Sequence, residues 1–395
     1  MVRSRFKIVN QLEDFSRDGD KRVFSKPLPV HHLPASLSKF NPEVAEFATK
    51  EYNLASRGYS AVYLENITLL LWKWEDKPNS DFVCIPIFDS RYCMLSTYWA
   101  QYYRFGTLSP TLDEFSLSFS LYDTPSLTLE GSYLFLGGHD TFTHWVADHL
   151  GVALHLAPLS KKGKFPFLCF NLRDWQSDFL SNLSPDAQLF NIDLSAFPPG
   201  PTRLVVEGLW LMDYIDIANR QWIVRNAVAE VAMREGLRQE KPISNIYYLE
   251  RSNPSSNKPK RVLNAFDLQR VVKDLGGIVV DPAALGFIDK IRYFFIGDAI
   301  FVNEPGSGET NFSFFSSIGS KLVQLIHPEV LSNPNHHAIN AGWKYILPRL
   351  DSISFLTGNQ LDPQNGRLDY YLDGAEYSPR DLERLLHELL AGVKS

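Results

Sequence analysis

Two side chains in the first half of the chain, His144 and Asp148, have the types and spacing of a general base and its orienting partner. They fall four residues apart in a segment whose apolar residues recur at helical spacing, so both should emerge on one face near the helix start. The alternative is an exposed His–Asp pair without a catalytic role, with His139, His149 and His155 as surface histidines. The histidines of this cluster fan around the helix, which disfavours a metal site.

A glycine-rich turn in the second half has the pattern of an anion site. An apolar run at residues 299–302, typical of a buried parallel strand, is broken at Pro305, and residues that favour a helix start follow. The turn and the helix start comprise Gly306, Ser307, Gly308, Thr310 and Asn311. A strand that leads through such a turn into a helix presents unpaired N–H groups and the positive end of the helix dipole, which favour phosphate.

Two arginines lie near this turn in the predicted fold. Arg251 comes just after a strand predicted at residues 245–249, and Arg261 follows a short polar loop. Because ligands bind at the carboxyl ends of strands in open parallel sheets, Arg251 and the glycine turn should face one crevice, with Arg261 close enough in sequence to join them. Two guanidinium groups beside a helix amino terminus suit a diphosphate. Alternatively, the arginines pair with carboxylates such as Glu250 or Asp267.

The elements that position these residues alternate as strand and helix, which predicts an α/β fold with parallel sheets. The predicted strands cover residues 61–71, 82–88, 112–119, 133–136, 165–170, 204–211, 245–249, 278–280, 299–302 and 321–326. Besides the helices that carry His144 and Asn311, the predicted helices cover residues 175–183, 217–239, 263–275, 287–295 and 378–393.

With 395 residues, the chain is too long for one ordinary core and suggests two domains. We predict a boundary near residue 240, where a long amphipathic helix ends. Residues 1–240 then form a first domain that begins with a polar, proline-dotted arm of about 60 residues. Residues 241–377 form a second domain, and residues 378–395 form a final helix of the kind that often packs across a domain junction.

Composition narrows the class of protein. The apolar fraction of 45% and the charged fraction of 21% are typical of globular proteins, and the net charge of −6 with dispersed Lys and Arg argues against nucleic-acid binding. Three cysteines without CxxC spacing indicate reduced thiols and no zinc site. The amino terminus lacks an apolar signal segment, and no apolar run is long enough to span a bilayer. We therefore expect a cytoplasmic protein with at most peripheral membrane association.

The order of these features resembles that of glycosyltransferase family 61. In that family, a helix start with an aromatic residue and His-Trp-Leu-x-Glu/Asp comes first, and this chain has His144-Trp145 followed by Asp148. A strand ending in Arg-Ser and then Arg-x-Leu-Asn come next, matched here by Arg251-Ser252 and by Arg261 with Asn264.

A glycine-rich helix start and a further strand come last in the family. The matches are the 306–311 segment and Gln324-Leu325, so that the motifs together span roughly residues 60–350 in the family order. This chain departs from the family at Pro305, which replaces a histidine, and at Ala265 and Gln324, which replace acidic residues. These departures put a donor contact, or activity itself, in question.

The resemblance implies a GT-B architecture, in which two Rossmann-like domains face each other across a cleft. It implies a UDP-sugar donor in the second half, a glycan acceptor in the first, inversion at the sugar carbon, and no metal or further cofactor. The implied base is Asp148 or His144, with Glu309 in reserve. The implied donor-binding residues are Arg251, Arg261, Asn264, Gly306, Ser307, Gly308, Thr310, Asn311 and Gln324.

Two alternatives remain open beside sugar transfer in the synthesis of a bacterial surface polysaccharide. One is the transfer of another group, such as pyruvyl, to a glycan. The other is a sugar- or nucleotide-binding module that has lost its chemistry, as the three departures from the family would allow.

Overall fold

In a computed structural model, the chain divides into two compact units. The first comprises Met1–Pro29 and Arg57–Ile215, and the second comprises Val30–Ser56 and Asp216–Ser395. The structure describes residues 4–9, 23–25, 35, 60–73, 82–88, 93–95, 114–117, 126–138, 142–160, 165–198, 200–212, 215, 217–251, 262–304, 308–326, 346–360 and 375–393. Most of the predicted amino-terminal arm lies outside these residues.

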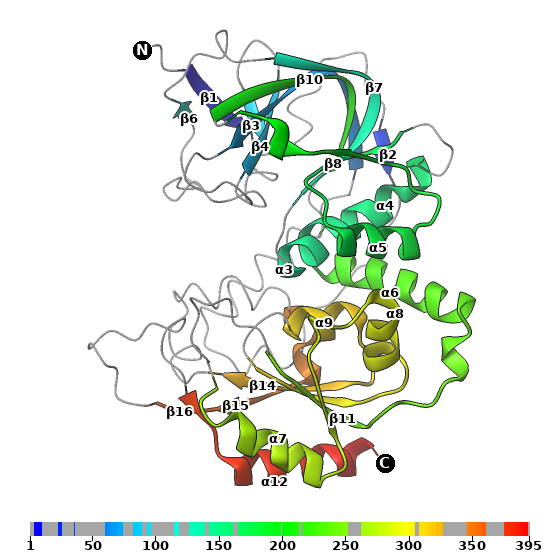
Figure 1. The fold of residues 1–395 in the computed structure, drawn as a ribbon, viewed down its shortest axis with the longest axis vertical. Coiled ribbons are helices and arrows are strands. Elements are labelled where there is room, and N and C mark those ends of the chain that lie inside the picture. The colour runs from blue at the N-terminus through cyan, green and yellow to red at the C-terminus, as the bar shows by residue number, and fades with distance from the viewer. Residues whose placement is uncertain are drawn as a thin grey trace. The chain divides into compact units, whose positions relative to one another are not determined.

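The first unit is built on a sheet of ten described strands (Figure 1). The strands are β1 (Ser4–Val9), β2 (Val23–Ser25), β3 (Ser60–Lys73), β4 (Phe82–Phe88), β5 (Cys93–Leu95), β6 (Glu114–Leu117), β7 (Ser126–Gly137), β8 (Phe167–Phe170), β9 (Leu189–Ile192) and β10 (Gly200–Met212). Their order is β6-β1-β5-β4-β3-β10-β7-β8-β9, and β2 pairs with β3.

Only part of this sheet has the expected Rossmann-like character. Strands β10, β7, β8 and β9 are mutually parallel, whereas β3 is antiparallel to both β10 and β4. The parallel strands are linked by α3 (Phe142–His144), the π-helical segment η4 (Trp145–Leu150), α4 (Gly151–Ser160), α5 (Asp174–Leu183) and the short η5 (Leu194–Ala196). The sheet is therefore mixed, and the prediction of a Rossmann-like first half holds for its parallel strands alone.

The second unit has an entirely parallel central sheet in the order β12-β11-β13-β14-β15. Its strands are β11 (Ile246–Leu249), β12 (Ile278–Val280), β13 (Ile300–Asn303), β14 (Lys321–Ile326) and β15 (Ile353–Thr357), and a separate pair is β16 (Asn359–Gln360) with β17 (Ala375–Glu376). The helical segments are α6 (Ile217–Arg234), η6 (Leu237–Gln239), α7 (Ala265–Asp274), α8 (Phe287–Lys290), η7 (Ile291–Phe295), α9 (Gly308–Phe315), η9 (Leu347–Ser352) and α12 (Pro379–Val393).

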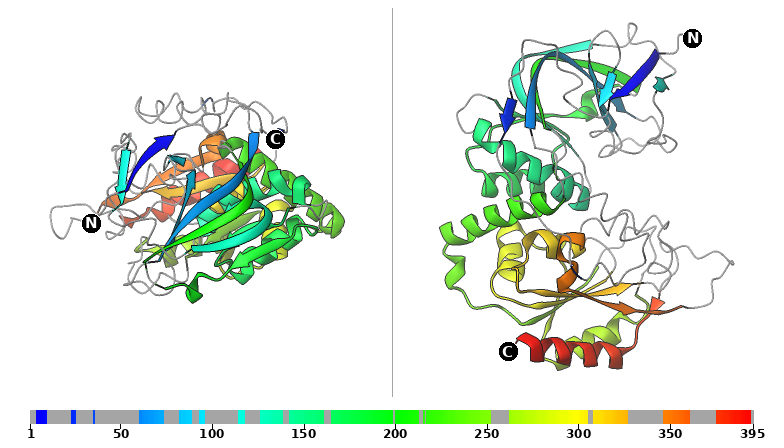
Figure 2. Two further views of the ribbon diagram at one scale, coloured as in Figure 1. Left: turned by 90° about the horizontal axis from the view of Figure 1, so that it is seen from above. Right: turned by 180° about the vertical axis from the view of Figure 1, so that it is seen from behind.

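Helices cover both faces of this sheet, as in doubly wound α/β folds. Figures 1 and 2 show α7 and α12 on one face and α6, α8 and α9 on the other. Leu382 and Leu386 of α12 are buried in one core cluster with Tyr248 and with Leu268 and Val272 of α7. The final helix therefore belongs to the core of the second unit, whereas the sequence allowed it to cross the junction between domains.

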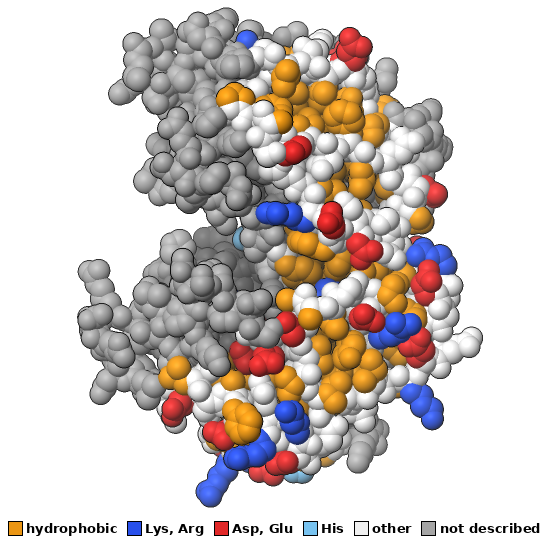
Figure 3. Space-filling view, in the orientation of Figure 1, with side chains coloured by type: hydrophobic (Ala, Val, Ile, Leu, Met, Phe, Trp, Pro, Cys, Tyr) orange, Lys and Arg blue, Asp and Glu red, His pale blue; other side chains and the backbone are white. Residues whose placement is uncertain are grey.

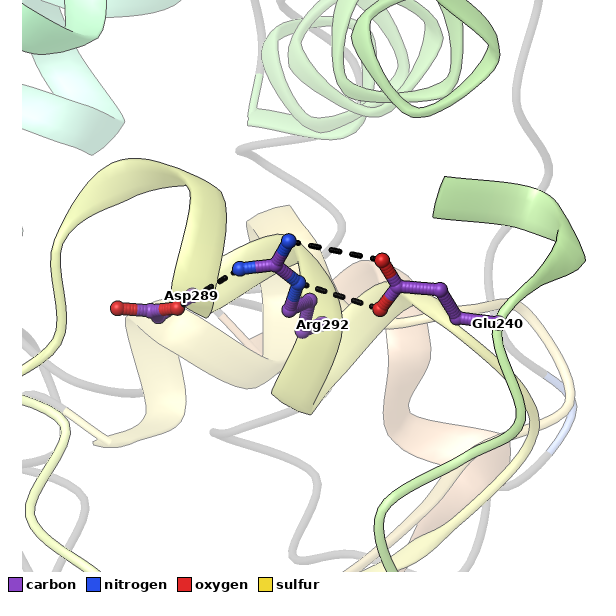
Figure 4. Close-up of polar contacts among 3 residues, drawn as sticks. All are labelled: Glu240, Asp289 and Arg292. Atoms are coloured by element: carbon purple, nitrogen blue, oxygen red, sulfur yellow. Dashed lines mark hydrogen bonds and ion pairs between the residues drawn. The ribbon is translucent and has the colours of Figure 1, made fainter. Parts of the chain in front are cut away.

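The units divide between Ile215 and Asp216, ahead of the boundary predicted near residue 240. Helix α6 belongs to the second unit because it packs on α9, η7 and η9. An exposed ion pair joins the segment after α6 to η7, because Arg292 Nε lies 3.1 Å from Glu240 Oε2 (Figure 4). Arg292 Nη1 also lies 3.3 Å from Asp289 Oδ1 on the preceding helix α8. Amphipathic periodicity located the helix but could not tell which core receives its apolar face.

A buried guanidinium holds the carboxyl end of α9. Arg349, 6% exposed, donates to the backbone carbonyls of Phe312, Ser317 (2.9 Å) and Ser320 (3.1 Å), and its guanidinium carbon lies 4.2 Å from the centre of the Phe312 ring. A cation at a helix carboxyl terminus satisfies carbonyls that have no partner within the helix and interacts favourably with its dipole. The opposite, amino-terminal end of α9 is thereby fixed at the carboxyl edge of the sheet.

Acidic and basic side chains are mixed on one face of the second unit. On the face in Figure 3, acidic and basic groups of the described residues are interspersed over the second unit. None of the helices in the described part of the chain combines the length and apolar character that crossing a bilayer requires.

Candidate functional site

In the first unit, the predicted catalytic pair, His144 and Asp148, follows the strand at which the sheet order reverses. Counted along the chain, the parallel strands β10-β7-β8-β9 stand in the order 4-1-2-3, so the reversal lies between β7 and β10. Ligands in open α/β sheets bind outside the carboxyl ends of the strands at such a point. His144 and Asp148 lie on the helical segment that follows β7 and therefore belong to this edge.

The structure brings the two side chains together. His144 Nδ1 lies 3.1 Å from Asp148 Oδ2, and the two side chains differ sharply in exposure, at 39% for His144 and 3% for Asp148. The carboxylate is thus a buried partner of a half-exposed imidazole, which differs from the exposed pair considered above. When Nδ1 carries the proton, the second ring nitrogen, Nε2, can accept one.

Side-chain contacts hold the helical segment that carries this pair against β7 and α5. His149 Nδ1 lies 2.8 Å from the carbonyl oxygen of Leu136, and this contact joins η4 to the end of β7. Trp145 is fully buried, with its ring centroid 5.2 Å from that of Trp175 on α5. At Gly138, a Cβ atom would lie 2.2 Å from the carbonyl oxygen of Phe170, so only glycine lets the ends of β7 and β8 approach this closely.

Two histidines of this segment differ from the surface role considered for them, and His139 lies outside the described residues. His149 and His155 are both buried, at 2% and 1% exposure. Among the residues that the structure describes, no group of three or more His, Cys, Asp or Glu side chains could hold a metal ion. Cys169 is a free, buried thiol whose pKa is raised by burial.

In the second unit, the strand order β12-β11-β13-β14-β15 reverses between β11 and β13. Counted along the chain this is 2-1-3-4-5, the order of one of the two common doubly wound sheets, in which the ligand sits at the reversal. Leu249 of β11 pairs with Asn303 of β13, so Arg251 and the segment leading to Gly308 leave the sheet at the same edge. The predicted shared edge is thus present.

A hydrogen-bonded chain of side chains lies along this edge. Asn303 Nδ2 donates to Gln324 Oε1 over 2.8 Å, and Gln324 Nε2 donates to Glu309 Oε1 over 3.2 Å. Gly308 packs directly on this chain, because a Cβ atom there would lie 1.7 Å from Asn303 Oδ1. The glycine is therefore required by the close contact between the end of β13 and the start of α9.

Two predicted caps occupy different positions from those expected. Helix α9 begins at Gly308, so Thr310 and Asn311 lie inside its first turn and are both 1% exposed. The Oδ1 atom of Asn311 accepts a hydrogen bond of 3.2 Å from Lys290 Nζ. The N–H groups of the first turn, including those of Gly308 and Glu309, are the ones without carbonyl partners inside the helix.

Asn264, predicted to bind the donor, makes two backbone contacts. Its Nδ2 donates to the Tyr377 carbonyl over 2.7 Å, and its Oδ1 accepts from the Tyr377 N–H over 3.0 Å. These bonds join the start of α7 to the segment before α12. Asn264 therefore stabilises the fold at this point. Arg261, Gly306 and Ser307 lie outside the described residues.

Carboxylates share the second edge with the arginine. Glu304 accepts a hydrogen bond of 2.9 Å from the Tyr248 hydroxyl, and Glu250 accepts one of 3.3 Å from Gln269 Nε2. Asp267, considered as a partner for the arginines, lies 3.3 Å from Arg270. These carboxylates repel an anionic ligand, so positive charge at this edge is needed to offset them.

Sequence reasoning missed two residues at this edge, Asn303 and Lys290. Asn303 is the polar last residue of an otherwise apolar strand, a signal that could have singled it out. Lys290 shares a helix face with the buried Phe287, Ile291 and Phe294, so its spacing already placed a lysine among core positions.

The fold and these two edges define an α/β protein whose polar residues gather where the order of parallel strands reverses. In comparisons with known proteins, no family model matches the chain, and none of the curated proteins matches it. The resemblance to glycosyltransferase family 61 rests on the residues and spacings given above.

Proposed function

We propose that the protein is an inverting, metal-independent glycosyltransferase that moves a sugar from a UDP-sugar to a glycan acceptor. The observation that carries the proposal is the carboxyl edge of the second sheet, where Arg251 and the amino terminus of α9 leave adjacent strands at the reversal of strand order. The motif order gives independent support. In this proposal the two units are the domains of a GT-B enzyme and face each other across a cleft.

The donor site would lie at this second edge. A diphosphate leaving group needs fixed positive charge and oriented donors where charge develops in the transition state. Arg251 supplies a planar guanidinium, and the first turn of α9 supplies N–H groups at the positive end of the helix dipole. Gly308 lets the start of α9 pack closely on the end of β13, and Arg261 would add a second guanidinium.

The acceptor site would lie at the first edge, with His144 as the base. Its Nε2 takes the proton of the acceptor hydroxyl while that oxygen forms a bond to the anomeric carbon. On the opposite side of the sugar, the bond from this carbon to the diphosphate oxygen breaks, and UDP departs with the electron pair. The buried Asp148 holds the imidazole in the required tautomer and stabilises the imidazolium that forms. Glu309, at the donor edge, is the alternative base.

The cellular setting is part of the proposal. We infer a bacterial, cytoplasmic enzyme of capsule, exopolysaccharide or lipopolysaccharide synthesis, which meets its acceptor in solution or through peripheral contact with a membrane. The mixed surface charges and the net charge of −6 favour small, sugar-containing ligands over nucleic acid.

Binding and turnover with a panel of nucleotide sugars test this function. We expect UDP and one or more UDP-sugars to bind in isothermal titration calorimetry without added metal and in the presence of EDTA. Phosphoenolpyruvate should not compete with UDP. Arg251→Ala should weaken UDP binding, whereas the exposed Arg292→Ala should not. Binding of phosphoenolpyruvate without binding of UDP would indicate pyruvyl transfer. If no nucleotide sugar binds, the proposal is refuted.

A further inference from the structure

A buried lysine links two elements at the donor edge. Lys290, the last residue of α8, is 4% exposed, and its Nζ donates to the carbonyl oxygen of Pro282 and to Asn311 Oδ1, the latter over 3.2 Å. Pro282 lies two residues past the end of β12, and Asn311 is in the first turn of α9. The ammonium group therefore bridges the carboxyl edge of the sheet and the amino-terminal turn of α9.

The Pro282 carbonyl and the Asn311 amide are neutral acceptors, so these two hydrogen bonds leave the charge of the ammonium in place. An ammonium bound to a carbonyl and an amide keeps its net positive charge, and burial weakens the screening of that charge by water. Burial lowers the pKa of Lys290 to about 8, and the Asp281 carboxylate opposes this shift. On the surrounding elements, Asp289 pairs with Arg292, and Glu309 accepts from Gln324. Helix α6, which packs on α9 and η7, adds the buried Arg220 and the partly buried Arg225.

We infer that Lys290 is a positioning residue for the donor diphosphate: it fixes the first turn of α9 through Asn311 and adds a buried positive charge beneath that turn. This inference rests on the proposed function. It does not require the ammonium to touch the ligand, since the charge acts through the field at the helix amino terminus. It also supplies a cation that offsets the carboxylates at this edge.

A pH dependence of binding follows from this placement. A bound diphosphate stabilises the protonated form of Lys290 and raises its pKa above the value of about 8 in the free protein. Because ligand and proton then bind cooperatively, UDP affinity is greatest below pH 8 and falls as pH rises through the free-state pKa. The fall ends once the pH exceeds the pKa of the complex.

Calorimetric titration of UDP between pH 7 and 9.5 tests the inference on the full-length wild type, Lys290→Met, Lys290→Gln and Arg292→Met. UDP itself ionises at its terminal phosphate, with a pKa of about 6, and at the uracil N3–H, with a pKa of about 9, and these steps affect all four proteins alike. The pH dependence assigned to Lys290 is therefore the difference between the wild type and the Lys290 variants. We expect wild-type affinity to fall about tenfold or more across the range, the factor produced by a weakly screened charge. Both Lys290 variants should bind more weakly at pH 7 and show a weaker dependence on pH, whereas Arg292→Met should match the wild type.

Hydrogen exchange of the α9 amides separates the positioning role from simple loss of fold. Lys290→Met should speed exchange in the first turn of α9 while leaving β11 and β13 protected. Wild-type-like affinity and pH dependence in both Lys290 variants would overturn the inference and leave the proposed function standing. Failure of the wild type to bind UDP at every pH would overturn the proposed function and this inference with it.

Discussion

Replacing Arg349 by Met should destabilise the second unit far more than its position in the short 3₁₀-helical segment η9 suggests. Besides the contacts given above, its guanidinium donates to Ser316 and to the Ile318 carbonyl oxygen (3.1 Å), so that acceptors in five residues depend on it. These acceptors lie at and just beyond the carboxyl end of α9. Met matches the apolar stem of Arg but lacks the guanidinium, so the variant removes the donors, the charge and the contact of the guanidinium with the Phe312 ring.

The magnitude follows from the acceptors left behind. A buried acceptor without a partner costs about 1–3 kcal/mol of stability. If water does not reach two of the acceptors around Arg349, the free energy of unfolding falls by roughly 2–6 kcal/mol. Loss of the cation at the helix terminus adds about 0.3–2 kcal/mol. Burial and the nearby Arg225 lower the pKa of Arg349, so removing the charge also relieves a penalty. We expect a net loss of about 3–5 kcal/mol, typical of breaking a buried charged network.

Urea unfolding with hydrogen-exchange mass spectrometry measures this effect. Because two units can unfold separately, exchange in peptides from α9 and β13 identifies the transition that belongs to the second unit. Arg292→Met is the matched control, since it removes a guanidinium whose ion pairs are exposed and should leave the transition almost unchanged. Equal transitions for the Arg349→Met and Arg292→Met variants would refute the reasoning.

Three further predictions concern the two edges. Gly308→Ala forces Asn303 away from Gln324 and should cost about 1–3 kcal/mol and weaken UDP binding, with Gly392→Ala, where a Cβ atom meets open space, as the control. Asp148→Asn and His144→Gln should each lower kcat about 10²–10⁴-fold with UDP affinity unchanged, and the double variant should fall no further; additive losses would contradict a paired role. The free energy of unfolding of the wild type, relative to Lys290→Met, should rise by up to about 3 kcal/mol between pH 8 and 10.5, because the unfolded lysine keeps its proton over this window while the folded one loses it; a flat difference in denaturant midpoints would contradict the lowered pKa.

Local sequence patterns located most of the elements around the site. The strands β4, β12 and β14 and the helical segment 287–295 coincide with the predicted ranges, because apolar runs between turn residues mark buried strands and a 3.6-residue period marks helices. Strands such as β9 and β15 were not predicted. Strand β9 is short and half exposed, and its place is decided by pairing with β8, which no local pattern encodes.

The sequence also determined that His144 and Asp148 form a pair, because a four-residue helical spacing brings such side chains together. It could not determine that the carboxylate is buried and the imidazole half exposed, since that depends on packing against α5 and β7. Nor could it show that Lys290 meets Asn311, because the contact joins two helices across the carboxyl edge.

By itself, the sequence therefore determined the α/β class and the candidate site residues that follow the strands. Only the tertiary structure decided the order of the strands, which places the reversal points beside those residues. It also decided that α6 belongs to the second unit and that Asn264 serves the backbone of Tyr377. The physical reason is that strand order and helix docking depend on contacts between residues far apart in the chain, whereas spacing along the chain encodes only local geometry.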